Sequence, residues 1–147
     1  MLKQACVADL RHARVSRADG YIVLAMRCYP RGVSKTLRDE YLSCLGPPAE
    51  LLNDLHAHKQ DTSHNEAFDR ANYEERFDLN ADGREALKRL VDLSRTRDVY
   101  LICQCKPDEK CHRELLLLLA KKWYKAEVQE LRFGYPKFEE RLSPAEG

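Results

Sequence analysis

The sequence predicts an α/β fold: a single compact domain with a mostly parallel sheet flanked by helices. Two continuous apolar runs, residues 21–26 and 99–103, lack polar alternation, which is typical of strands covered on both faces. Helical patterns separate these runs, as expected of parallel strands joined by crossover helices. The length of 147 residues suits one domain, which we place at residues 1–142, with a C-terminal tail at 143–147.

Two strands are expected in the N-terminal part of the chain. Residues 4–9 form a short apolar first segment, and Asp19-Gly20 marks a turn into the run at 21–26. A proline and a glycine in the next loop end this strand, because neither residue suits the interior of a sheet.

Helices are expected to fill the middle of the chain. Ser34 suits the N-cap of the first helix, and the Gly-Pro-Pro sequence at 46–48 ends that helix and starts another. Apolar residues at helical spacing define the later segments. The expected helices lie around residues 34–45, 51–55, 65–77 and 86–93.

The C-terminal third contains a strand, a cysteine-bearing loop and an apolar helix. The strand covers 99–103, and the helix opens on Cys-His-Arg at 111–113, with Asp108 as its expected N-cap. A short last strand is expected over 127–132. Since ligands bind at the carboxyl ends of parallel strands, the loops after residues 26 and 103 are the candidate site.

The composition limits the classes of function. The chain has 25 basic and 24 acidic residues, for a formal net charge of +1, which disfavours binding of nucleic acid through bulk positive charge. A nucleic-acid adaptor is therefore our third hypothesis. No run approaches the roughly 20 apolar residues of a membrane span, and the N-terminus lacks a secretory apolar region. We expect a cytoplasmic protein with no membrane contact, in which the six cysteines do not form a disulfide framework.

Cationic residues follow both candidate strands. The first loop carries Arg27, Arg31 and Lys35, and the second contributes Arg113. Arginine can clamp an oxyanion with two hydrogen bonds, and Gly32 allows backbone N–H groups to approach a ligand. We expect a small anionic ligand here. The alternative interpretation of the first loop alone is a solvated charged surface.

The thiols beside this cleft suggest nucleophilic catalysis. A helix N-terminus lowers the pKa of a cysteine, so Cys111 or Cys105 is the candidate nucleophile and His112 the candidate acid or base. The substrate would then be nucleotide-like or otherwise phosphorylated. The spacing does not match the Cys-x5-Arg motif of tyrosine phosphatases.

Metal binding is the alternative hypothesis. Cys103 and Cys105 point the same way from an extended segment, and with Cys111 and His112 they could hold zinc or iron. The spacing is not that of a standard zinc finger, and neighbouring residues on a helix diverge by about 100°, so Cys111 and His112 are not expected to share an ion easily. Simple packing is a third interpretation, especially for Cys103. The other histidines are expected at the surface: His12, His56, His58 and His64.

A distinctive pattern surrounds the first loop: Asp19-Gly20, Val23-Leu24, Arg27 and Tyr-Pro-Arg-Gly-Val-Ser-Lys at 29–35. In this pattern the chain resembles the YeaO-like family of small prokaryotic proteins, and the similarity extends over residues 9–126. Gly-Pro-Pro-Ala-Glu-Leu at 46–51 lies near the place of the family's Pro-Ser-x-x-Leu. That family is catalogued as a domain of unknown function, so the resemblance implies an α/β fold and no established activity.

Two features depart from the YeaO-like pattern. The family usually has Trp at the position of Tyr29, and its members commonly lack the cysteines after the last main strand. The Cys-His-Arg sequence at 111–113 resembles instead another branch of the wider superfamily.

Overall fold

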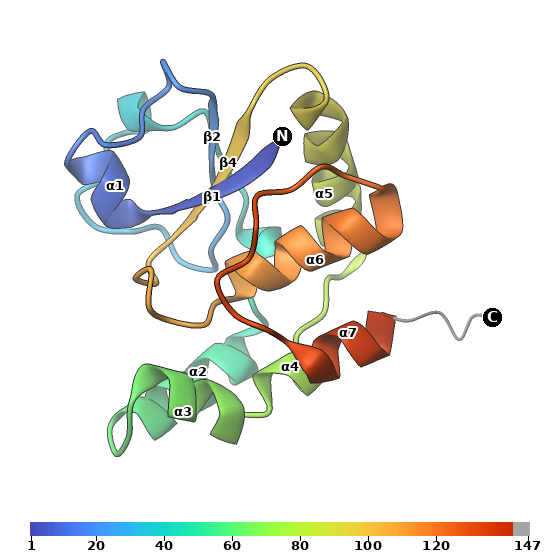
Figure 1. Cartoon of the computed structure of the whole chain (residues 1–147). Helices are drawn as coiled ribbons and strands as arrows, with labels where there is room; N and C mark the ends of the chain where they lie inside the picture. The colour runs from blue at the N-terminus through green and yellow to red at the C-terminus, as the bar shows by residue number, and fades with distance from the viewer. Residues whose placement is uncertain (143–147) are drawn as a thin grey trace.

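A four-stranded, entirely parallel sheet forms the centre of the computed structural model, which describes residues 1–142 (Figure 1). The strands lie in the order β1 (Leu2–Cys6), β4 (Val99–Cys103), β2 (Tyr21–Leu24) and β3 (Glu40–Tyr41). The predicted α/β class, parallel sheet and single compact domain are confirmed. The expected tail at 143–147 lies outside the described residues.

Seven α-helices are present within residues 1–142. They are α1 (Val7–Arg11), α2 (Ala49–Lys59), α3 (His64–Arg70), α4 (Tyr73–Arg76), α5 (Ala81–Ser94), α6 (His112–Tyr124) and α7 (Pro136–Leu142). No helix in this range is both long and apolar enough to cross a bilayer.

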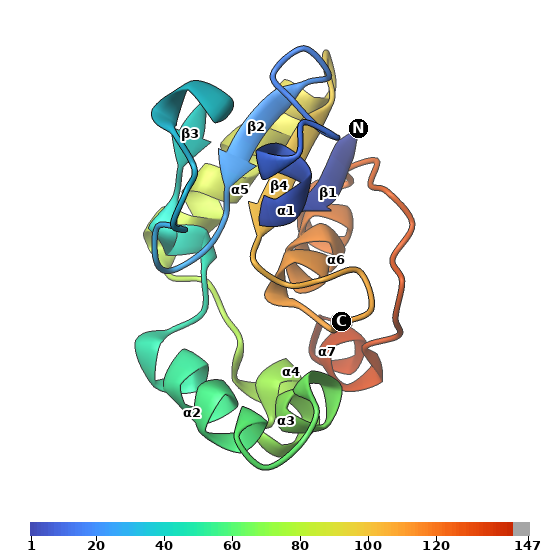
Figure 2. The same cartoon turned by 90° about the vertical axis from the view of Figure 1, so that its left-hand side faces the viewer.

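The helices cover the sheet on both faces. Helices α5 and α6 cover one face, and α1 with the loop after β2 covers the other (Figures 1 and 2). Leu101 and Ile102 of the central strand β4 are therefore fully buried, one in the core of each face. The strands point towards α2, α3 and α4, which lie beyond the carboxyl end of the sheet (Figure 2).

The segment around residues 34–45 is not the expected helix. Ser34 does cap a turn, since its side chain accepts the backbone N–H of Thr36, but that turn is a short 3₁₀ helix, Lys35–Leu37. Strand β3 then pairs with β2, and a second 3₁₀ helix covers Ser43–Leu45. Sheet pairing overrides the helical spacing of the leucines because it satisfies the backbone groups of β2.

Three other expectations need correction. The first strand ends at Cys6 and continues as α1. The helix expected over 65–77 is broken by Asn72, whose φ of 54° is left-handed, into α3 and α4. The last strand expected over 127–132 is a single parallel bridge between Leu2 and Val128.

Candidate functional site

Cys111 is the N-cap of α6. Its backbone is extended, with φ −150° and ψ 148°, and its Sγ accepts the backbone N–H of Arg113 at 3.4 Å. Asp108, the expected N-cap, lies three residues earlier in the loop. The side chain of Cys111 is therefore held at the positive end of a helix dipole, where negative charge on sulfur is favoured.

The three thiols of the β4–α6 segment converge. Cys103 Sγ lies 2.8 Å from Cys111 Sγ, and both side chains are 1% exposed. Cys105 lies in the same loop and lines the cavity beside them, close enough for its ionisation to depend on both thiols. The loop after β4 turns back over the end of the strand, so thiols that are eight residues apart meet at one point.

His112 joins this cluster. Its Nε2 lies 2.5 Å from the carbonyl oxygen of Ala25, and a carbonyl can only accept, so Nε2 carries the proton. The lone pair of Nδ1 then faces Cys111 Sγ at 3.7 Å. The expected divergence of Cys111 and His112 is wrong, because Cys111 lies in extended backbone just before the helix.

The surroundings shift the pKa values of the three thiols in different directions. Burial opposes charge on Cys111, but hydrogen bonds from Cys103 and Cys105 and the nearby Arg113 guanidinium hold its pKa well below the ordinary value. Hydrogen bonds with Cys103 and Cys111, together with burial, raise the pKa of Cys105 well above its usual range. Burial raises the pKa of Cys103 and lowers that of His112. Cys111 is therefore the thiol of the three that ionises most readily.

Arg113 is buried behind the cluster. Its Nε donates to Gln4 Oε1 at 2.8 Å, and one terminal nitrogen donates to the carbonyl oxygens of Ala5, at 2.7 Å, and Cys105, at 3.4 Å. Only 1% of the residue is exposed, and it does not line the neighbouring cavity. In this structure Arg113 fastens β1 to the start of α6 and acts on the thiols through its charge.

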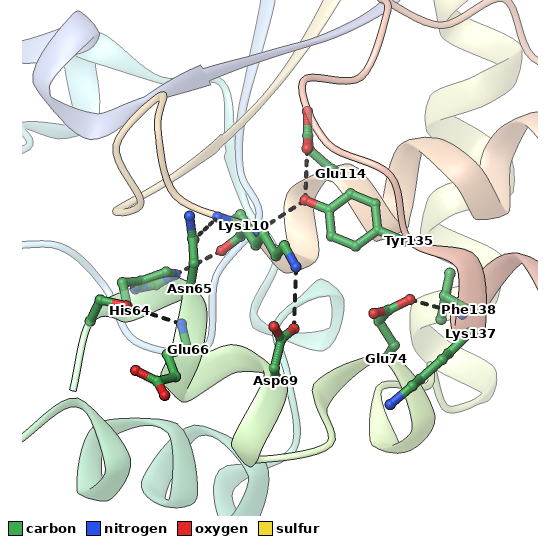
Figure 3. Close-up of polar contacts among 12 residues, drawn as sticks. His64, Asn65, Glu66, Asp69, Glu74, Lys110, Glu114, Tyr135, Lys137 and Phe138 are labelled. Carbon is green, nitrogen blue, oxygen red and sulfur yellow. Dashed lines mark hydrogen bonds and ion pairs between the residues drawn. The ribbon is translucent and has the colours of Figure 1, made fainter. Parts of the chain in front are cut away.

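Glu114 forms the centre of a second buried network. Its carboxylate accepts Gln4 Nε2, the hydroxyl of Tyr135 and the backbone N–H of Arg132, each at 2.7 Å. Figure 3 shows the bond between Tyr135 and Glu114. The Tyr135 oxygen also accepts the backbone N–H of Cys111 at 3.3 Å. This network connects the segment before α7 to the N-cap of α6.

A cavity of about 260 Å³ opens beside the cluster, between the ends of β2 and β4 and the helices α2 and α3. Cys103, Cys105, Cys111 and His112 form part of its wall. The rest of the wall is mixed. Its apolar part is Met26, Pro47, Leu52, Leu55, Phe68 and Tyr73, and its cations are Arg27, Lys59 and Lys110.

Of the expected anion-binding loop, Arg27 and Cys28 line the cavity. Arg31, Gly32 and Lys35 are exposed and do not line it. Gly32 has a left-handed φ of 75°, and the preceding carbonyl, that of Arg31, accepts a hydrogen bond from Arg11. This loop therefore packs over α1, away from the thiols.

Several cavity residues come from segments that the sequence did not single out. Lys59 and His64 belong to the α2–α3 region and carry no local motif. The expectation of a surface position for His64 is wrong, since its side chain is 8% exposed. Lys110 and Glu109 could have been found, because they lie beside Cys111 in the same loop.

Comparison with known families gives one match. A family model described as DUF488-N3a, the active DUF488-N3 subclade, matches residues 6–124. The matched region contains β2 and its loop as well as the whole cysteine cluster. Neither the curated proteins nor the solved structures yielded a match.

Proposed function

This chain belongs to the DUF488 family, and we propose that it is an enzyme that uses Cys111 as a nucleophile on a small anionic ligand. The similarity to YeaO-like proteins, which are themselves DUF488 members, is confirmed at the level of that family. One observation carries the proposal: Cys111 Sγ lies at a helix N-cap, in a cavity wall, 3.7 Å from the free Nδ1 of His112.

The proposed chemistry is a displacement. Cys111 Sγ forms a bond to an electrophilic atom of the ligand, and the bond to the leaving group breaks with its electron pair. His112 Nδ1 takes the thiol proton and returns it to the leaving group. Water then attacks the covalent adduct and restores the thiol. The N-terminus of α6 stabilises negative charge that develops beside Cys111.

The cavity wall indicates the class of ligand. The side chains of Leu52, Leu55 and Phe68 offer an apolar surface for a flat or aliphatic body. Arg27, Lys59 and Lys110 offer positive charge for an anionic group. A nucleotide-like or otherwise phosphorylated compound has both parts, which is why we favour this class.

Alkylation by iodoacetamide, followed by peptide mass spectrometry, tests the nucleophile. Cys111 should react faster than Cys28, an exposed thiol, and replacing His112 by Ala should slow only the Cys111 reaction. AMP or inorganic phosphate should slow alkylation of Cys111 but not of Cys44, which lies outside the cavity. A Cys111 that stays unmodified after Cys28 has reacted completely would contradict the proposal.

A metal-binding module is the second candidate function. The ligand atoms of Cys103, Cys111 and His112 all lie within 4.8 Å of one another. The Nε2–H of His112 is bound to a backbone carbonyl, which is how histidines that ligate metals are commonly oriented. With Cys105 as a further ligand, these residues fit zinc or iron. Elemental analysis of protein purified without an affinity tag tests this candidate. The wild-type protein should contain stoichiometric metal, and Cys103→Ala should lose it.

A further inference from the structure

A second group of ligand-type side chains lies at the rim of the cavity. The ligand atoms of His64, Cys105 and Glu109 lie within 4.8 Å of one another, and all three residues line the cavity. His64 is the first residue of α3, whereas Cys105 and Glu109 belong to the β4–α6 loop. The group therefore joins two segments that are about forty residues apart in the chain.

The protonation of His64 is determined by its surroundings. Its Nε2 lies 2.7 Å from the carbonyl oxygen of Lys110 and must donate to it, so Nε2 carries the proton of the neutral ring. Nδ1 is then an acceptor. It is buried and has no hydrogen-bond partner, and the side chain as a whole is 8% exposed. An unpartnered buried nitrogen is costly unless something binds it.

The nearest charged atom to this nitrogen is also an acceptor. Glu109 Oε2 lies 3.6 Å from Nδ1, so a lone pair faces a carboxylate across a gap too long for a direct hydrogen bond. The two atoms repel each other unless a cation lies between them. Either a proton converts His64 to an imidazolium ion, or a metal ion binds both atoms. The thiol of Cys105 in the same group favours the metal.

We propose that His64, Cys105 and Glu109 bind a zinc ion at the rim of the cavity. One thiolate, one imidazole nitrogen and one carboxylate oxygen form a ligand set that suits zinc, and three protein ligands leave a coordination position open. On binding, Cys105 gives up its thiol proton to solvent. Because all three residues line the cavity, a zinc ion held there would bind an anionic group of a ligand in the cavity.

Hydrogen bonds hold the two ligand-bearing segments together (Figure 3). Asn65 Oδ1 accepts the backbone N–H of Lys110 at 2.7 Å, and Asn65 Nδ2 donates to the carbonyl of Asp108 at 3.1 Å. The Lys110 ammonium pairs with Asp69 at 3.2 Å. These bonds fix the start of α3 against the loop, so the three ligands are positioned before an ion arrives.

Zinc titration of the full chain tests this site. Tag-free protein stripped of metal is titrated with zinc against a chromophoric chelator, and one equivalent should bind. His64→Ala should weaken binding by at least about 100-fold and Glu109→Gln by about 10-fold, since loss of a direct ligand should cost at least as much as loss of a supporting residue. His56→Ala, at another histidine of the cavity wall, is the matched control and should bind zinc like the wild type.

Glu109→Gln is the variant that should remove a ligand without unfolding the loop. The amide keeps an oxygen that can accept the backbone N–H of Lys106, which Glu109 Oε1 accepts at 2.9 Å, so the loop should fold normally. Replacing zinc by Co²⁺ should give an absorption band of thiolate-to-metal charge transfer, and Cys105→Ser should remove it. Circular dichroism of each variant confirms that the chain is folded.

Three outcomes would overturn the inference. Wild-type protein that binds no zinc would leave a His64–Glu109 ion pair as the explanation of the geometry. Loss of binding in Cys111→Ser with none in His64→Ala would place the ion on Cys103, Cys111 and His112. A cobalt complex without thiolate absorption would exclude Cys105. Alkylation of Cys111 is measured on metal-free protein, so the proposed nucleophile and the zinc site can fail independently.

Discussion

Replacing Tyr135 by Phe should destabilise the protein through the N-cap of α6. The Tyr135 hydroxyl donates to Glu114 Oε1 at 2.7 Å and accepts the backbone N–H of Cys111 at 3.3 Å. The residue is fully buried, so water cannot replace either bond. Burial and the Glu114 carboxylate raise the pKa of Tyr135 far above its usual range, which keeps the hydroxyl protonated as a donor.

The size of the effect follows from these two contacts. The lost bond to a carboxylate costs about 1.5–3 kcal/mol, and a buried N–H left without an acceptor costs about 1–3 kcal/mol. The more apolar phenylalanine ring offsets part of this cost, so we expect the free energy of unfolding to fall by about 2–4 kcal/mol. Urea unfolding followed by circular dichroism measures it.

Tyr124→Phe is the matched control. Its hydroxyl donates to the carbonyl of Arg84 at 3.3 Å at an exposed position, so the change should stay within about 0.5 kcal/mol. A loss below about 0.5 kcal/mol for Tyr135→Phe would refute the reasoning, because the Glu114 network would then not stabilise the N-cap. The rate of alkylation of Cys111 in the same variant should also change, whereas the rate for Cys28 should not.

Two further predictions concern regions away from the cluster. Gly46→Ala should lower the free energy of unfolding by about 2 kcal/mol or more, because a Cβ there would lie 2.3 Å from the backbone nitrogen of Arg27. Gly134→Ala, with nothing within 4 Å, should be near neutral in the same urea experiment. Burial and the Glu40 carboxylate raise the pKa of Tyr21 to about 12, so its phenol should titrate near that value in an ultraviolet difference spectrum against Tyr21→Phe. Because this pKa is raised on folding, Tyr21 stabilises the fold below about pH 10, and this contribution is lost between about pH 10 and 12. Titration near pH 10 in the folded protein would contradict this.

The sheet could be predicted from sequence because its central strands are unambiguous. Val99–Cys103 and Tyr21–Leu24 are continuous apolar runs, and burial on both faces leaves such runs no other stable position. The region around residues 34–45 could not be predicted, because its leucine spacing fits a helix. The segment forms a strand instead, because Glu40 and Tyr41 pair with β2, which is distant in the sequence.

Only the part of the candidate site that is continuous in sequence, from β4 to α6, could be predicted. Strand, loop and helix follow one another in sequence, so the meeting of Cys103, Cys105 and Cys111 follows from topology. The other part comes from α2 and α3, and nothing near Lys59 or His64 in the chain indicates the cavity. The cationic loop shows the opposite case. Arg31 and Lys35 carry a strong local motif, but they do not line the cavity, because the loop turns at the left-handed Gly32 and packs over α1.

The contact between Tyr135 and the N-cap of α6 also has a consequence for biosynthesis. Chains are made from the N-terminus, and Cys111 obtains its backbone partner only when a residue 24 positions later has been added. During that interval Glu114 also lacks the Tyr135 hydroxyl and the backbone N–H of Arg132. The nascent chain therefore carries its thiols before it can shape them into a site, and the order of synthesis postpones their chemistry until Tyr135 has been added.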